Sequence, residues 1–196
     1  MIDLTVFRQF PRLMAKRVIL RQGLKTDVEA IFDIKCRSSL TANYAQEPHR
    51  QPEDSDRWLE RARDSFANQK DMLWVVELAE KQCVIGSVTL WNLHEMDECA
   101  ELGYEIHPDF EGRGYMSEAV QAVLDFGFNS LGLQRVEALP LARNRPSRKL
   151  LERNGFILEG VLRRKICFHD EFLDQCIYSV LRDEWRSAQV DGTSTK

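Results

Sequence analysis

The chain has 196 residues, of which 43% are hydrophobic and 30% charged, and its formal net charge is −4 at pH 7. This length accommodates one domain whose core is large enough to need neither disulfides nor metal. The composition is that of a globular protein, and so small a negative charge provides no basic field for a phosphate backbone, so nucleic acid is not expected as a partner.

Five cysteines are scattered along the chain, with no C-x-x-C pair and no nearby histidine at metal-ligand spacing. We therefore predict reduced, mostly buried thiols and no metal site. The first 17 residues lack the uninterrupted apolar core of a signal peptide, and no apolar run approaches the roughly 20 residues that span a bilayer. These features predict a cytoplasmic protein with no membrane partner.

The first third of the chain predicts one strand and two helices. Residues 17–22 carry the first β-branched cluster, which is typical of a strand. Thr26 and Glu29 have the spacing of a capping box, so a helix is expected to start near residue 27. The polar stretch 38–51 is the longest predicted loop, and a second amphipathic helix follows Pro52.

Three strand-like runs come next, at 72–79, 83–91 and 99–106, and they are close enough together for an antiparallel meander. From Gly114 the hydrophobic period changes to that of a helix, which is expected to stop at Gly132. The chain therefore passes from strand to helix at a glycine-containing loop.

The last third predicts a strand at 134–139, a helix capped by Asn144 and ended by Gly155, and a hairpin of 156–168 with 172–181. Because a strand, a helix and a second strand follow one another over this part of the chain, at least one parallel pair is expected. A mixed sheet covered by helices accommodates this order.

The two ends of the chain carry no such pattern. Residues 1–14 are predicted to form a flexible N-terminal segment, and residues 188–196 a disordered tail. A single domain is expected between them, over 15–187.

The segment HPDFEGRGYMSEA places Gly112 and Gly114 at the junction of a strand and a helix. Unpaired N–H groups at a helix N-terminus attract anions, and glycine lets the backbone approach them closely, so the loop predicts a phosphate-bearing ligand. Tyr115 and Met116 exclude the G-K-[ST] of a P-loop, and Ser117 replaces the third glycine of a dinucleotide fingerprint.

Further motifs surround the loop: E-L-G-Y at 101–104, G-Y-x-x-E-A at 114–119, and N-x-x-S-x-x-[L/V]-[L/M]-E-x-x-G-F-x-x-E-G at 144–160. Together they make the chain similar to the GNAT superfamily of acyl-CoA-dependent N-acetyltransferases. Within that superfamily it resembles most the branch that includes the ribosomal-protein-alanine N-acetyltransferases. The matches run from about residue 16 to residue 186.

This resemblance implies an α+β fold, with a mixed central sheet of about seven strands flanked by about four helices. The sheet is expected to be splayed between its fourth and fifth strands, where the cofactor lies. The family's pyrophosphate loop, [Q/R]-x-x-G-x-[G/A], is matched only at Gly114, since Glu111 and Met116 occupy its first and last positions. A carboxylate at Glu111 has to point away from a diphosphate, whereas Met116 needs only its backbone N–H.

The resemblance also implies the residues of the site. Acetyl-CoA is expected to contact the end of one strand, the loop and the following helices, at Tyr104, Ile106, His107, Gly112, Arg113, Gly114, Tyr115, Met116, Ser117, Asn144 and Ser147. The acceptor amine is expected near Tyr44, Trp91, Asn92 and Glu105. Simpler alternatives are a helix cap for Asn144, a solvated side chain for Arg113 or Glu105, and a structural role for His107, which could also be a base.

Direct transfer to an amine requires a base for the ammonium proton and a hydrogen-bond donor for the oxyanion and thiolate. Glu101 matches the position where several relatives keep a catalytic glutamate, with a solvated strand residue as the alternative. Leu151 stands where many members of the superfamily have a tyrosine that protonates the departing thiolate. In this branch the serine that corresponds to Ser147 is the usual substitute. A plain cofactor contact is the alternative for Ser147.

We therefore expect an acetyl-CoA-dependent N-acetyltransferase that acts on a protein N-terminus or a small-molecule amine, as a monomer or a homodimer. Variation over residues 38–70 is expected to set the acceptor. The alternative is a non-catalytic CoA-binding or sensor module, which Glu111, Met116 and the absent tyrosine favour and Asn144, Ser147 and Glu101 disfavour.

Overall fold

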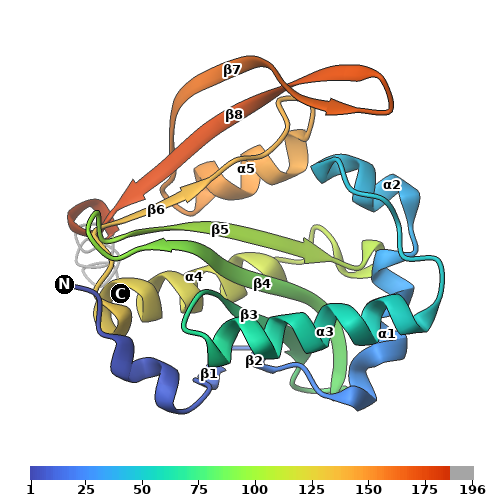
Figure 1. Cartoon of the computed structure of the whole chain (residues 1–196), viewed down its shortest axis with the longest axis horizontal. Coiled ribbons are helices and arrows are strands. Elements are labelled where there is room, and N and C mark those ends of the chain that lie inside the picture. Colours follow the sequence, from blue (N-terminus) through green and yellow to red (C-terminus); the bar gives the residue numbers. More distant parts are fainter. Residues whose placement is uncertain (186–196) are drawn as a thin grey trace.

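The computed structural model describes residues 1–185 and contains one mixed sheet with helices on both sides (Figure 1). The strands are β1 (Leu13–Met14), β2 (Val18–Gln22), β3 (Met72–Leu78), β4 (Cys83–His94), β5 (Cys99–Ile106), β6 (Arg135–Ala138), β7 (Ile157–Phe168) and β8 (Glu171–Leu181). The α-helices are α1 (Val28–Lys35), α2 (Ser38–Thr41), α3 (Pro52–Ala67), α4 (Tyr115–Phe126) and α5 (Arg145–Arg153). The eight strands lie in the order β1-β2-β3-β4-β5-β6-β8-β7. Their neighbours are antiparallel except for the parallel pair β5 and β6.

Both faces of the sheet are covered, and β3 shows this residue by residue. Trp74 and Val76 belong to the main core, which includes the buried face of α4, whereas Val75 packs with Ile31 of α1 and Leu59 of α3. Successive strand residues point to opposite faces, so a strand buried on both sides has no polar alternation. The continuous apolar run of β3 follows from its central place in the sheet.

The predicted α+β fold is confirmed, and the seven predicted strands correspond to β2–β8. The eighth, β1, is a two-residue strand that no pattern in the sequence indicated. The four predicted helices correspond to α1, α3, α4 and α5. The segment 38–51 is not wholly a loop, because α2 and a 3₁₀ turn over Ala42–Tyr44 lie in it.

Residues 1–14 were expected to be loose, whereas the structure packs them against the domain. Ile2 and Phe7 are buried in the main core, and the N–H of Asp3 donates to the carbonyl of Leu131 at 2.8 Å. Trp74 Nε1 donates to the carbonyl of Pro11 at 2.8 Å. Single apolar residues anchor this segment, which is why no periodic signal announced it. The predicted tail at 188–196 lies outside the described residues.

The thiols are free, as expected, but they are less buried than predicted. Only Cys176 is fully buried, Cys167 is exposed, and the other three are partly exposed.

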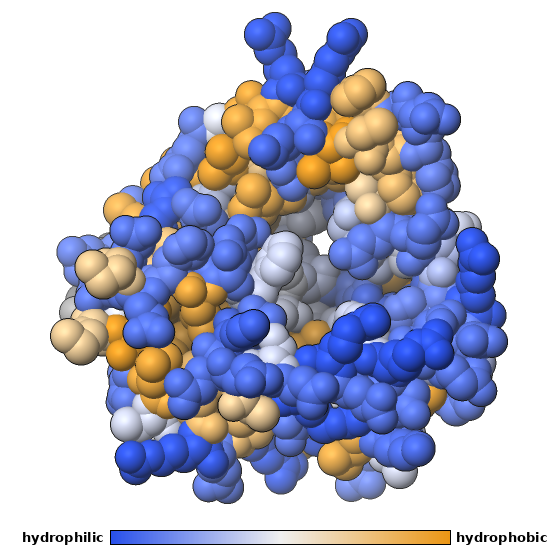
Figure 2. All heavy atoms as spheres, in the orientation of Figure 1, coloured by the Kyte–Doolittle hydropathy of each residue, from blue (hydrophilic) through white to orange (hydrophobic). Residues whose placement is uncertain are grey.

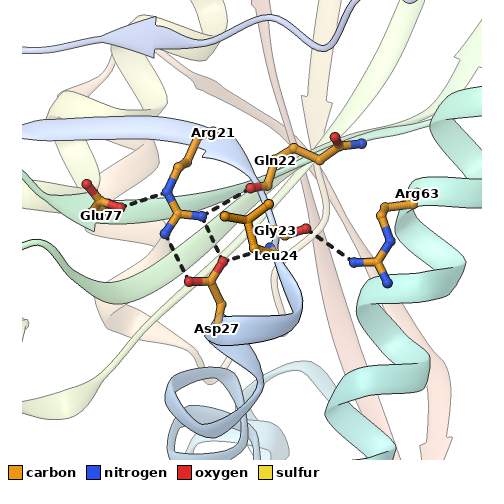
Figure 3. A network of polar contacts seen from close by, with 7 residues as sticks. All are labelled: Arg21, Gln22, Gly23, Leu24, Asp27, Arg63 and Glu77. Carbon is orange, nitrogen blue, oxygen red and sulfur yellow. Dashed lines mark hydrogen bonds and ion pairs between the residues drawn. The ribbon is translucent and has the colours of Figure 1, made fainter.

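The start of α1 is fixed by an arginine-centred network, not by the predicted Thr26–Glu29 capping box (Figure 3). Arg21 donates to both oxygens of Asp27 at 2.7 and 2.9 Å and to Glu77 at 2.7 Å. Asp27 also accepts from the N–H of Leu24 at 2.8 Å. The two carboxylates raise the pKa of Arg21, so this cation stays charged while it ties β2 to β3 and to α1.

The sheet opens between β5 and β6, as predicted for its fourth and fifth expected strands. The two strands share only three register pairs, at Cys99, Ala100 and Glu101, and in Figure 1 they diverge beyond that point. In the described chain, the edge of β5 from Leu102 to Ile106 that faces β6 has no strand partner. Figure 2, in the orientation of Figure 1, shows a hollow near the centre of the molecule, below the surface formed by β7 and β8.

Candidate functional site

The loop at 111–116 lies where the open edge of β5 ends. Gly112 and Gly114 have φ of +71° and +83°, in the left-handed region that favours glycine. Gly114 is the N-cap residue of α4 and offers no capping side chain. In the part of the chain that the structure describes, no amide from Gly112 to Ser117 donates to an acceptor outside the helix. A helix start with free amides is suited to an anion.

The side chains around the loop differ in exposure and in contacts. Glu111 and Arg113 are exposed, and the guanidinium carbon of Arg113 lies 5.9 Å from the centre of the Phe110 ring. Met116 is buried beneath the loop, where a side-chain carbon added to Gly86 would come within 3.2 Å of its Cε. Ser117 donates to Asn154 at 2.9 Å, which fixes the first turn of α4 against the end of α5.

Ser147 of α5 and Tyr104 of β5 form a short contact across the opening of the sheet. Ser147 Oγ lies 2.7 Å from the Tyr104 hydroxyl, which is also 3.2 Å from the Ser147 carbonyl. Asn144 caps α5 by accepting from the N–H of Ser147 at 3.2 Å, as its sequence position predicted. Burial raises the pKa of Tyr104 well above its ordinary value, so its hydroxyl stays protonated at neutral pH.

Glu101 lies on the opposite face of β5, since odd and even strand positions alternate. Its Oε1 accepts from Asn92 Nδ2 at 2.7 Å, and Trp91 is its register partner on β4. Trp91 is 49% exposed, so a large aromatic surface lies open beside the carboxylate. The structure therefore brings Trp91 and Asn92, which the sequence assigned to the acceptor, beside the predicted base Glu101, which is only partly buried.

Glu105 lies four residues further along the same face, and it is the centre of a buried polar cluster. Lys35 Nζ is 2.9 and 3.1 Å from its two oxygens, the Tyr44 hydroxyl donates to it at 2.7 Å, and Ser87 Oγ donates at 3.0 Å. The Lys35 ammonium also lies 4.3 Å from the Trp58 ring centre.

Opposing effects act on the carboxyl of Glu105. Burial alone raises its pKa, but Lys35 and the hydroxyl donors outweigh burial and hold the pKa below its ordinary value. Burial and then the Glu105 charge raise the pKa of Tyr44 far above its usual range. The alternative of a solvated Glu105 is wrong, because the side chain is an ionised, internally paired group.

His107 is held in the structure at the end of β5. It is 7% exposed, and its backbone N–H donates to the carbonyl of Ile85 at 2.8 Å. Its ring Nδ1 accepts from the backbone N–H of Asp109 at 3.2 Å. Its Nε2 lies 3.0 Å from Asp33 Oδ2, within ion-pair distance but without hydrogen-bond geometry. These contacts agree with the structural alternative for His107. Ile106, beside it, packs partly buried against the main core.

The segment 42–47 joins the two sides of the opening. Its carbonyls at Ala42 and Asn43 accept from Arg143 and Asn144, each at 3.2 Å, while Tyr44 reaches Glu105 on β5. Further along, Glu47 contacts His169 in the turn between β7 and β8.

Sequence reasoning missed several of these residues. Lys35 is 70 positions from Glu105, and the hydroxyl of Tyr104 is 43 positions from Ser147, so neither contact leaves a local pattern. Ser87 faces Glu105 as its register partner, which a correct strand alignment would have revealed. Across residues 1–185, no three His, Cys, Asp or Glu side chains gather as a metal site. The same residues contain no helix with the length and apolarity needed to cross a membrane.

Comparison with known protein families identifies the family of this chain. Residues 17–157, most of the chain, match the acetyltransferase (GNAT) domain family. This chain belongs to the GNAT acetyltransferase family. Acetyl transfer to an amine is the reaction that its N-acetyltransferase relatives are named for.

Two curated relatives show how far the sequence similarity extends. The uncharacterized N-acetyltransferase YoaA of Bacillus subtilis is 31% identical over 173 residues, which cover 88% of this chain and 98% of the relative. The ribosomal-protein-serine acetyltransferase of Escherichia coli is 30% identical over 100 residues, 51% of this chain and 56% of the relative.

The fold of this GNAT chain is also found in solved structures. The crystal structure of spermidine N-acetyltransferase from Vibrio cholerae, in complex with CoA and spermine, superposes with a TM-score of 0.77 at 22% identity. It covers 87% of this chain and 98% of that one. At this identity the comparison supports the fold alone.

Proposed function

We propose that the chain transfers the acetyl group of acetyl-CoA directly to a primary amine, without a covalent enzyme intermediate. The observation that supports this most is the coincidence of two features at one end of β5. The loop presents free amides at a helix N-terminus, and the strand that leads into it has an unpaired edge beyond Glu101. An elongated ligand with an anionic group fits both.

The residues fit the coenzyme in the following way. Acetyl-CoA supplies an activated thioester carbonyl when it is bound. The amides of Gly112 to Ser117 would hold its diphosphate, and the free main-chain groups at Tyr104 and Ile106 would hold the amide-containing arm. Asn144, at the start of α5, would contact the same ligand.

Ser147 would stabilise the sulfur as it leaves. The Tyr104 hydroxyl carries one proton, and its 2.7 Å contact with Ser147 Oγ is shorter than its 3.2 Å contact with the carbonyl. Because Tyr104 stays protonated and can donate to Oγ, the Ser147 proton is free to point at the thiolate.

Glu101 would accept the proton of the incoming ammonium, directly or through water. Asn92 holds Oε1, which leaves Oε2 available for the proton. The exposed Trp91 beside it would form one wall of the acceptor site. The acceptor is a protein N-terminus or a small amine, in keeping with the named substrates of two relatives, a ribosomal protein and spermidine.

The proposal is tested with the full chain and a panel of amines. At about 100 times its Kd, acetyl-CoA should stabilise the protein by about 2.7 kcal/mol, or roughly 5–10 °C in Tm. Thiol release should then follow with spermidine, an aminoglycoside or peptides that begin with serine or alanine. No stabilisation refutes the proposal, and binding without turnover on every amine supports the non-catalytic module.

Ser147→Ala should lower kcat by roughly 10- to 100-fold and change the Kd of acetyl-CoA by less than about threefold. The substitution keeps the N–H that Asn144 caps and the carbonyl that Tyr104 contacts, so only Oγ is lost. Steady-state kinetics and calorimetry separate the two quantities. Equal losses in kcat and affinity would reduce Ser147 to a binding contact.

Glu101→Gln should flatten the acidic side of the pH–rate profile and lower kcat by roughly 100-fold near neutral pH. Glutamine can keep the Asn92 contact through its amide oxygen, but it does not titrate. A variant profile with the wild-type shape would exclude Glu101 as the base.

A further inference from the structure

Arg17, just before β2, makes four contacts with the loop and the first turn of α4. Its backbone N–H donates to Glu118 Oε2 at 2.9 Å, and its side-chain Nε donates to Glu118 Oε1 at 2.6 Å. Its Nη2 donates to the carbonyl of Arg113 at 2.9 Å, and its guanidinium carbon lies 4.4 Å from the Tyr115 ring centre. One residue, nearly 100 positions away in sequence, therefore contacts the loop at Arg113 and Tyr115 and the first turn of α4 at Glu118.

These contacts orient the loop for an anion. A carbonyl that faces Arg17 cannot face a bound anion, so fixing the Arg113 carbonyl leaves the adjacent amides to point the other way. Glu118 lies in the first turn of α4, where an unpaired carboxylate would repel the same anion. The ion pair with the Arg17 guanidinium neutralises it, and the Arg17 backbone N–H binds its second oxygen.

Gly114 is also explained by this arginine. A side-chain carbon at Gly114 would lie 3.1 Å from Arg17 Nη2, and its φ of +83° already disfavours other residues. The glycine that the motif associates with close approach of a ligand thus also leaves room for the guanidinium to pack against the loop.

We propose that Arg17 is the positioning residue of the diphosphate-binding loop. It acts through Glu118, Tyr115 and the Arg113 carbonyl, and it sets the affinity for the diphosphate part of the ligand. This inference rests on the proposed function, because it assumes that the loop receives acetyl-CoA.

The test compares two ligands, acetyl-CoA and S-acetylpantetheine, which lacks the diphosphate. Arg17→Gln should weaken acetyl-CoA binding by roughly 10- to 100-fold and change S-acetylpantetheine binding by less than about twofold. Arg17→Lys should recover only part of the loss, since one ammonium cannot reproduce the planar fork of contacts. If the glutamine variant does not fold, the lysine variant carries the comparison.

Arg21→Gln is the matched control. Arg21 lies four residues further along the chain, in β2, and also pairs with carboxylates, but its contacts are with Asp27, Glu77 and Gln22, not with the loop (Figure 3). It should lower Tm without changing the ratio of the two affinities.

Equal weakening of both ligands by Arg17→Gln, or no weakening of either, would overturn the positioning role while acetyl-CoA binding by the wild type still supports the proposed function. A wild-type protein that binds the two ligands equally would also overturn the positioning role, and one that binds neither ligand would overturn both proposals.

Discussion

Replacing Lys35 by methionine should lower the free energy of unfolding by about 3–5 kcal/mol at pH 7, which is the usual loss when one partner of a buried ion pair is removed. The Glu105 carboxylate, which is 8% exposed in the wild type, would lose its cation and, among the described residues, keep its hydrogen bonds from Tyr44 and Ser87. Urea unfolding, followed by Trp58 fluorescence beside the substituted site, measures the change.

The pH dependence of this variant should have the opposite sign from that of the wild-type pair. In the wild type the pKa of Glu105 is depressed below 4.5, so the pair contributes stability above that pH and loses it as the pH falls further. Without Lys35, burial dominates and raises the pKa, so stability should fall as the pH rises through the new value. The deficit should therefore be smaller at pH 5 than at pH 7.

The double variant Lys35→Met/Glu105→Gln is the control, because it removes both charges while the amide can still accept from Tyr44 or Ser87. It should recover a large part of the stability lost by Lys35→Met alone. A single-variant loss below about 1 kcal/mol, with no change between pH 5 and pH 7, would show that the pair is hydrated in solution.

Gly112→Glu should weaken acetyl-CoA binding by about 2 kcal/mol relative to Gly112→Gln, or roughly 30-fold, because a carboxylate would join the loop where the diphosphate is proposed to bind. Both variants place a side chain at φ of +71° in a space with no atom within 4 Å. Backbone strain is therefore the same in both, and the difference isolates charge.

Calorimetry at low and high salt checks this result, since the Glu-to-Gln difference should shrink as salt screens the repulsion. If the two variants bind acetyl-CoA equally well at low salt, the diphosphate does not bind at this loop.

Local patterns in the sequence predicted most of the architecture. The change of period at Gly114 marked the start of α4, and Gly132, with φ of +88°, follows the π-helical turn over Gly127–Leu131 that continues α4. The strand–helix–strand order gave the parallel pair. Each of these features depends on residues that are close together in the sequence, so it can be recognised before the fold is known.

Contacts between distant residues could not be predicted in this way. Nothing near Lys35 marks it as a buried cation, because its partner is on β5, and Arg17 meets Glu118 across 101 positions. Glu105 was correctly placed on the same strand face as Glu101, but its burial depends on α1 and the turn at Tyr44 folding over it. The site was thus predictable along β5 and the loop, but not in the residues that hold them.

The tie formed by residues 42–47 has a consequence for engineering. Chimeras that exchange this segment between relatives to alter acceptor choice would also remove the Tyr44 hydroxyl that donates to Glu105, and a changed backbone path would move the main-chain carbonyls that accept from Arg143 and Asn144. A graft that retains a tyrosine at position 44 and the backbone path of residues 42–43 should keep both sets of contacts while the other side chains change.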